Sequence, residues 1–219
     1  DGALTRLTAG RAVPVAGELG ASRKIISAGI SADMTQAAAV IDRDGRRALM
    51  VGPYGGTPIE AAVGREMTTP SFGPDVDSGY LAVDGKPVRW VYADGGSVRS
   101  APVDASAVTA AAPGPITDLQ VSPDGVRVAL VVGGRVLMAA LSVNDRGVPS
   151  LTGVYPLAPD LAGEVVDVAW STAKTLFIAR AGDDVPVWRT SIAGTQPVEI
   201  VSGNLKPPVA TMAASPTTV

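Results

Sequence analysis

The 219-residue chain contains no cysteine and no histidine, and only 4% of its residues are aromatic. These absences exclude a Ser-His-Asp triad, a cysteine nucleophile, a histidine-ligated haem and a structural zinc site within this chain. The lack of cysteine also excludes disulfides, which suits the cytosol and equally suits an exported protein. We therefore predict a protein that is not an enzyme and that carries no cofactor and no metal.

Charge is also scarce, with 18% charged residues and a formal net charge of -3. A nucleic-acid binder that neutralises phosphates needs the opposite sign, so nucleic acid is excluded as a partner. The few aromatic rings argue against a carbohydrate binder. The apolar runs, such as 128–132, end well short of the ~20 residues of a membrane-spanning helix. The opening residues Asp1–Leu4 lack the pattern of a signal peptide, which leaves room for an anchor or signal ahead of Asp1.

Turn-forming residues are abundant, with 25 glycines and 18 prolines. Asp-Gly pairs, which favour tight hairpin turns, stand at 44–45, 84–85, 94–95 and 124–125. Between them lie short runs rich in valine and alanine, without helical periodicity. This pattern predicts an all-β chain.

A short motif, an apolar residue followed by serine or glycine, recurs along the chain. Its apolar residue falls at 30, 72, 121, 170 and 214, so the spacing is 42 to 49 residues. A period of about 40–50 residues that holds several short strands is the signature of a β-propeller blade. Strands of stacked blades are buried on both faces and read as continuous apolar runs, as 128–132 does. We therefore predict that Trp90, Trp170 and Trp188 lie in the core between blades.

We predict a β-propeller of about four complete four-stranded blades with partial blades at both ends, more readily a fragment of a larger propeller than a small closed one. The predicted ranges are 1–24 for the outer half of one blade, 25–66, 67–112, 113–163 and 164–205 for the complete blades, and 206–219 for the first strand of the next. The second blade is less regular, and its pattern locates only the strands 89–92 and 97–102.

The run Val121–Val131 resembles the blade motif that WD40-like and TolB-like propellers share. Together with the segment Met34–Val51 and the composition rich in alanine, valine and glycine, the whole chain resembles the C-terminal propeller domain of the LpqB family of actinobacterial lipoproteins.

This resemblance implies a protein anchored by a lipid to the cell membrane and exposed outside the cytoplasm. It implies a partner as well, the extracytoplasmic domain of a sensor histidine kinase of the MtrB type, which signals to the regulator MtrA in cell-envelope homeostasis. The lipid-bearing cysteine of the family is absent here, so the anchor would lie upstream of this chain. The family offers no catalytic motif to carry over.

Candidate partner contacts follow from residue type and position. Arg43 and Arg46 belong to a basic cluster beside aspartates, and Tyr54 is the aromatic side chain most expected to be exposed. Asp94, Asp183 and Asp184, with Asp42 and Asp44, are expected at equivalent second-to-third strand turns and hence on one face. An acidic rim that binds a cation or a basic partner is one interpretation, and ordinary turn chemistry is the favoured one.

The alternative function is a small-ligand or cation site in the central channel. Asp118 and Asp167 both stand three residues before the apolar residue of the recurring motif. Their side chains could ring a channel, although hydrogen bonds to the neighbouring blade's backbone are favoured. The loop 75–79 is weakly similar to a calcium loop, but Lys86 occupies its twelfth position. Ser122 and Ser171 lack a base and are expected to be turn hydrogen-bonders.

Overall fold

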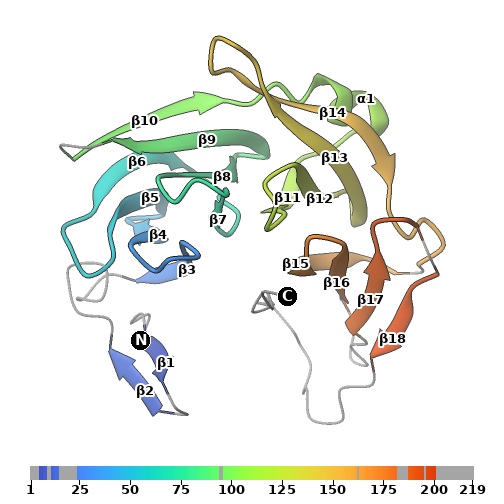
Figure 1. Cartoon of the computed structure of the whole chain (residues 1–219), viewed down its shortest axis with the longest axis horizontal. Helices are drawn as coiled ribbons and strands as arrows, with labels where there is room; N and C mark the ends of the chain where they lie inside the picture. Colours follow the sequence, from blue (N-terminus) through green and yellow to red (C-terminus); the bar gives the residue numbers. More distant parts are fainter. Residues whose placement is uncertain are drawn as a thin grey trace. The chain divides into compact units, whose positions relative to one another are not determined.

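The computed structural model describes residues 5–8, 11–14, 24–93, 96–161, 163–181, 187–194 and 196–200, with only the backbone described for 5–8, 11–14 and 199–200. These residues form four four-stranded antiparallel sheets and one two-stranded hairpin (Figure 1). The chain divides into two compact units, 1–102 and 103–219. Each unit contains two of the four-stranded sheets.

Unit 1 holds the hairpin and the first two large sheets. Its strands are β1 (Thr5–Thr8), β2 (Arg11–Pro14), β3 (Ile25–Ile30), β4 (Gln36–Arg43), β5 (Arg46–Pro53), β6 (Ile59–Gly64), β7 (Ser71–Phe72), β8 (Ser78–Val83), β9 (Lys86–Ala93) and β10 (Ser97–Pro102). The strands β3 to β6 form one meander and β7 to β10 the next, each in chain order. We call them sheet 1 and sheet 2.

Unit 2 repeats this arrangement. Its elements are α1 (Ser106–Ala111), β11 (Ile116–Val121), β12 (Arg127–Val132), β13 (Arg135–Val143), β14 (Pro149–Pro156), β15 (Val165–Thr172), β16 (Thr175–Arg180), β17 (Val187–Ser191) and β18 (Val198–Ile200). The strands β11 to β14 form sheet 3, and β15 to β18 form sheet 4.

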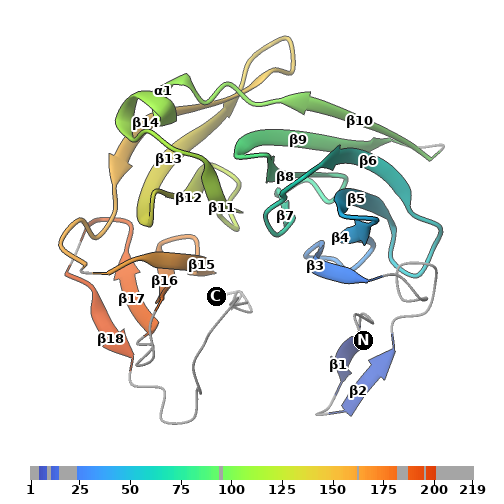
Figure 2. The same ribbon diagram turned by 180° about the vertical axis from the view of Figure 1, so that it is seen from behind.

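The all-β blade pattern predicted from the repeat is confirmed, because every large sheet is a separate meander of four consecutive strands. Two elements went unpredicted, the strand β8 and the helix α1. The strand β8 begins with Ser78-Gly79, which reads as a turn, and β7 is only two residues long. The helix α1 packs against β14 and buries Val108 (Figure 2). Among the described residues, no helix is long and apolar enough to cross a bilayer.

The core of unit 1 lies between its two large sheets. Sheet 1 contributes alternate residues of β4 and β5, including Val40, Leu49 and Val51, and sheet 2 contributes Leu81 and Trp90. Trp90 is fully buried, as predicted, and the Phe72 ring meets it edge-on. Burying a tryptophan removes a large apolar area from water, so this contact contributes strongly to the packing of the two sheets.

The core of unit 2 follows the same plan. Val131 and Met138 of sheet 3 pack with Trp170 and Ile178 of sheet 4, and Trp188 lies partly buried against this cluster. The prediction that all three tryptophans belong to the cores between sheets is therefore confirmed. The Trp170 indole N–H also donates to the carbonyl oxygen of Gln120, which joins the two sheets by a hydrogen bond of 2.9 Å.

A β-bulge recurs where the first strand of a sheet pairs with the second. The register shifts between Ile25 and Ser27, between Ile116 and Asp118, and between Val165 and Asp167. A bulge adds one residue to a strand and redirects the side chains around it. In each of these sheets the residue after the bulge is polar, namely Ser27, Asp118 or Asp167. This is the position at which the repeat predicts a carboxylate facing the channel.

Candidate protein-interaction surface

The turn between β3 and β4 is held by its own side chains. The Ser31 hydroxyl donates to the Asp33 carboxylate (2.7 Å) and accepts the Gln36 backbone N–H (2.9 Å). Asp33 also accepts the backbone N–H and the hydroxyl of Thr35. Hydrogen bonds from Ser31 and Thr35 hold the pKa of Asp33 below its ordinary value, so this exposed carboxylate is ionised at neutral pH.

The turn between β11 and β12 repeats this geometry. The Ser122 hydroxyl donates to Asp124 and accepts the Arg127 backbone N–H (3.0 Å). The prediction that Ser122 acts as a turn hydrogen-bonder is thus confirmed. Serine, aspartate and the first residue of the next strand stand at the same spacing in both turns.

Replacing Ser122 with alanine is expected to destabilise the protein by about 1–2 kcal/mol, because the partly buried Arg127 backbone N–H loses its side-chain acceptor and Asp124 loses a donor. Chemical denaturation measures this change. Ser142→Ala, which removes an exposed serine–serine hydrogen bond, is the control and should change stability by less than about 0.5 kcal/mol. Equal effects of the two substitutions would contradict the role given to Ser122.

Met34 differs from its counterpart in the second turn. Met34 has a φ of 60°, in the left-handed region, and the residue at the same position of the other turn is Gly125, with a φ of 72°. Met34 is 56% exposed. The sequence pattern assigns Met34 no role, although alignment of the two turns places it opposite a glycine.

Tyr54 lies beside this turn but is less exposed than predicted. Its backbone N–H donates to the Thr35 carbonyl oxygen (2.8 Å). Its side chain is half-buried, because it packs against a cluster that includes Ala39, Ala48 and Met50. The small alanines leave room for a ring at the surface of the sheet, and this packing could not be predicted from the loop sequence.

The loop between β7 and β8 carries Asp75 and Asp77, both exposed. The side-chain Nε2 atom of Gln36 donates to Asp77 across 3.5 Å, so this loop meets the Ser31–Gln36 turn. The Oε1 atom of Gln36 is buried and accepts no hydrogen bond. Among the described residues no three Asp, Glu, His or Cys side chains come together as a metal site, here or elsewhere.

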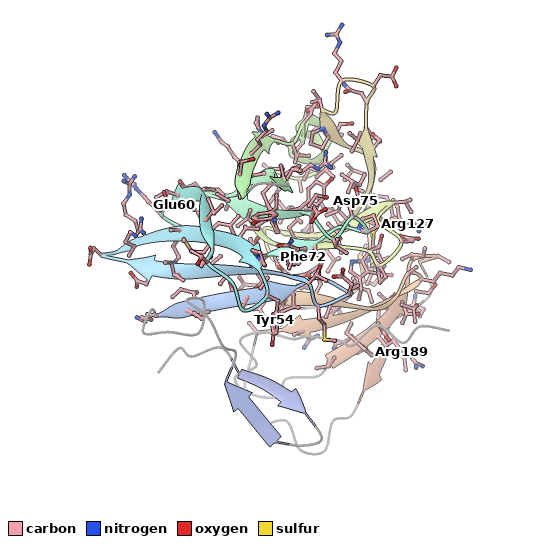
Figure 3. The ribbon with its side chains drawn as sticks, turned by 60° about the vertical axis from the view of Figure 1, so that its left-hand side comes forward. Tyr54, Glu60, Phe72, Asp75, Arg127 and Arg189 are labelled. Carbon is pink, nitrogen blue, oxygen red and sulfur yellow. The ribbon has the colours of Figure 1, made fainter. Side chains whose placement is uncertain are left out.

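Arg43 and Arg46 lie at the other end of sheet 1. Residue pairing puts Arg43 opposite Arg46 at the β4–β5 hairpin, whereas Gln36 lies opposite Pro53 beside Tyr54. The Arg43 guanidinium donates to the Glu60 carboxylate, and Figure 3 shows Glu60 apart from Tyr54. An exposed ion pair of this kind contributes little stability. The arginines and Tyr54 therefore do not form one surface.

The expected placement of Asp94 is wrong. Residues 94–95 join β9 to β10, the third and fourth strands of sheet 2, because the unpredicted strand β8 shifts the count by one. The second-to-third strand turn of this sheet carries Asp84 instead, whose carboxylate accepts the backbone N–H groups of Arg65 and Glu66. The side chains of Asp94, Asp183 and Asp184 lie outside the described residues, so their roles as partner contacts stay predictions.

Asp118 and Asp167 form a buried pair in unit 2, with 4% and 6% of each residue exposed. The Asp118 carboxylate accepts the Val168 backbone N–H of the neighbouring sheet (3.1 Å), as the favoured interpretation predicts. It is also hydrogen-bonded to the Asp167 side chain, which requires a proton on one of the two carboxyl groups. Burial raises the pKa of Asp118 above its ordinary value.

Solved structures confirm the class of fold. A putative TolB from Agrobacterium tumefaciens matches with a TM-score of 0.63 at 18% identity, over 90% of this chain and 73% of that one. TolB from Acinetobacter baumannii matches with a TM-score of 0.56 at 16% identity, over 89% of this chain and 47% of that one. A gluconolactonase from Xanthomonas campestris matches with a TM-score of 0.54 at 18% identity, over 81% of this chain and 62% of that one. At these identities the likeness shows the fold alone, a β-propeller.

The family is shown by sequence. The family model described as the lipoprotein LpqB beta-propeller domain matches residues 2–219. Lipoprotein LpqB of Nocardia farcinica is 36% identical over 99% of this chain, and that of Mycobacterium tuberculosis is 32% identical over the whole of it. The chain belongs to the LpqB β-propeller domain family. It spans 38% of the length of each of these two relatives.

Proposed function

We propose that this chain is the interaction domain of an extracytoplasmic lipoprotein, anchored to the cell membrane, and that it performs no catalysis. Its partner is the extracytoplasmic domain of a sensor histidine kinase of the MtrB type, and binding adjusts signalling at the cell envelope. Membership of the LpqB family supports the lipoprotein part of this proposal, because the relatives carry that name.

The observation that carries the interaction role is the pair of braced turns. Each one is fixed by a serine hydroxyl and an aspartate carboxylate, and each displays exposed side chains above a rigid sheet. Loops positioned by a rigid scaffold are where binding sites are usually found. A loop that is already ordered loses little conformational entropy on binding, so such turns suit protein recognition.

The alternative of a cation or polar ligand in a central channel gains no support from the carboxylates that suggested it. Asp118 accepts the backbone N–H groups of Leu119 and Val168, and Asp167 accepts that of Val168. Carboxylates already bonded to backbone donors and to each other would have to give up those bonds to hold a cation.

A titration of the full-length natural protein with the purified extracytoplasmic domain of the paired sensor kinase tests the proposal. We expect saturable binding with a dissociation constant on the order of micromolar, as measured by calorimetry. An unrelated sensor domain of similar net charge is the control. No detectable heat with the paired domain at about 100 μM would overturn the proposal.

A further inference from the structure

We propose that one end of unit 1, the Met34 face, is the docking surface for a basic, apolar segment of the partner protein. The Met34 face consists of Asp33, Met34, Tyr54, Asp75 and Asp77, from the turn 31–35 and the loops 53–58 and 73–77. This inference rests on the proposed function and deepens it. It assigns the interaction to one surface of the chain and specifies the chemistry of the partner. Tyr54 follows β5 of sheet 1 and Asp75 precedes β8 of sheet 2, and Figure 3 shows the two residues apart, with Phe72 between them.

The first observation is the unfavourable backbone conformation of Met34. A side chain in the left-handed region raises the energy of the backbone by about 1–2 kcal/mol relative to glycine, and the equivalent turn uses Gly125 there. More than half of Met34 is exposed, so core packing does not offset this cost. A flexible, polarizable methionine suits a surface that adapts to an apolar partner. The strained position therefore points to a contact outside the folded chain.

The second observation is uncompensated negative charge. In the turn of unit 2, Asp124 forms an ion pair with Arg127 at 2.9 Å. Gln36 stands at the position of Arg127 in the turn of unit 1, so Asp33 has no such partner. Within the part of the chain that the structure describes, none of Asp33, Asp75 and Asp77 has a cationic group within 4 Å.

The same three segments contain no lysine and no arginine, while the opposite end of sheet 1 carries Arg43, Arg46 and Arg47. In sheet 2, Arg89 lies over the ring of Tyr80 and is half-buried. Complementary charge steers association and suppresses wrong partners. A segment that carries lysine or arginine is thus favoured at the Met34 face and opposed at the arginine end.

The third observation is that the surface is already shaped. Asp33 fixes the turn through Ser31 and Thr35, and the Tyr54 backbone N–H ties the neighbouring loop to Thr35. Gln36 donates to Asp77 and so joins the third segment to the turn. The occupant that fits is an apolar residue on Met34 and Tyr54, flanked by a cationic group near Asp77.

The first arm of the test uses Met34→Gly in the full-length natural protein with the sensor domain. Glycine relieves the left-handed strain, so the melting temperature should hold or rise, whereas the affinity should fall about tenfold. Val126→Ala, which shortens an exposed apolar side chain in the equivalent turn of unit 2, is the matched control and should keep full affinity. Asp77→Asn should weaken binding and flatten its salt dependence.

Three results would overturn the inference while the proposed function survives. They are full affinity in Met34→Gly, equal losses in Met34→Gly and Val126→Ala, and a loss confined to Arg43→Gln or Arg46→Gln at the other end of sheet 1.

The second arm does not need the kinase. A synthetic peptide of alternating lysine and leucine is titrated into protein labelled with ¹³C at its methionine methyl groups. The Met34 signal, identified by its absence in Met34→Gly, should shift, and the signals of the buried Met50 and Met138 should stay in place. No shift of the Met34 signal, or equal shifts with an alternating glutamate–leucine peptide, would overturn the inference. If the sensor domain fails to bind, the proposed function is wrong. The peptide titration then tests by itself whether the Met34 face binds a basic, apolar segment.

Discussion

Replacing Gly79 with alanine is expected to destabilise unit 1 by about 3 kcal/mol or more. A Cβ atom at this position would lie 2.3 Å from Cζ2 of Trp90 and 2.7 Å from the Ser71 carbonyl oxygen. Trp90 is fully buried between two sheets and the Ser71 oxygen belongs to the backbone, so neither can move away cheaply. Chemical denaturation followed by tryptophan fluorescence measures the loss.

The matched control for this substitution is Gly73→Ala in the same sheet. The Cβ atom built there meets only ordinary van der Waals neighbours, the closest being the Ser78 hydroxyl oxygen at 3.5 Å. Gly73→Ala should change stability by less than about 1 kcal/mol. A Gly79→Ala protein as stable as the control would show that the packing of Trp90 against β8 is not as described.

Replacing Asp118 with alanine is expected to cost about 2–4 kcal/mol of stability, because the buried Leu119 backbone N–H loses its side-chain acceptor, the Val168 backbone N–H keeps only Asp167, and Asp167 loses its hydrogen-bonded partner. Asp118→Asn is the matched variant. An amide adds a donor for Asp167 but offers one acceptor oxygen where the carboxylate serves both Leu119 and Val168, so its cost at neutral pH should be smaller than that of alanine. Equal losses in the two variants would contradict the hydrogen-bonded pair.

The same pair predicts a pH dependence. Because the pKa of Asp118 is raised in the folded state, its protonated form is favoured there, and this stabilisation is present at low pH and is lost as pH rises through the folded pKa. Asparagine does not titrate. The stability of Asp118→Asn relative to the unchanged protein should therefore improve as pH rises from about 4 to 8. Parallel stability curves over that range would exclude a proton held by the pair.

Much of the fold could be predicted because local signals agree with it. In sheets 1, 3 and 4 the apolar runs are long, and at least one glycine stands between the second strand and the third. Sheet 2 was harder, since Gly79 is required by the close approach of Trp90, a contact between strands that no local pattern reveals. That hidden strand is also why Asp94 was assigned to the wrong turn.

The candidate surface was only partly predictable. Tyr54 was identified from its loop, but its burial depends on alanines from β4 and β5, which are distant in sequence. The arginines were identified from the sequence as a cluster. Strand pairing was needed to show that they lie at the opposite end of sheet 1 from Tyr54. Met34 could have been identified from the sequence, because a comparison of the two repeats shows a methionine at a position where the backbone conformation suits glycine.

The shared scaffold of the two serine–aspartate turns separates two kinds of evolutionary constraint. The serine and aspartate are required by backbone hydrogen bonding, whereas the positions of Met34 and Gln36 accept glycine and arginine in the sister turn. Those two positions can vary without disturbing the strands of the sheet that carries the turn. A lineage could therefore acquire a new recognition specificity by substituting the exposed Met34 and the buried Gln36 that contacts Asp77, while selection for folding continues to preserve the rest of the blade.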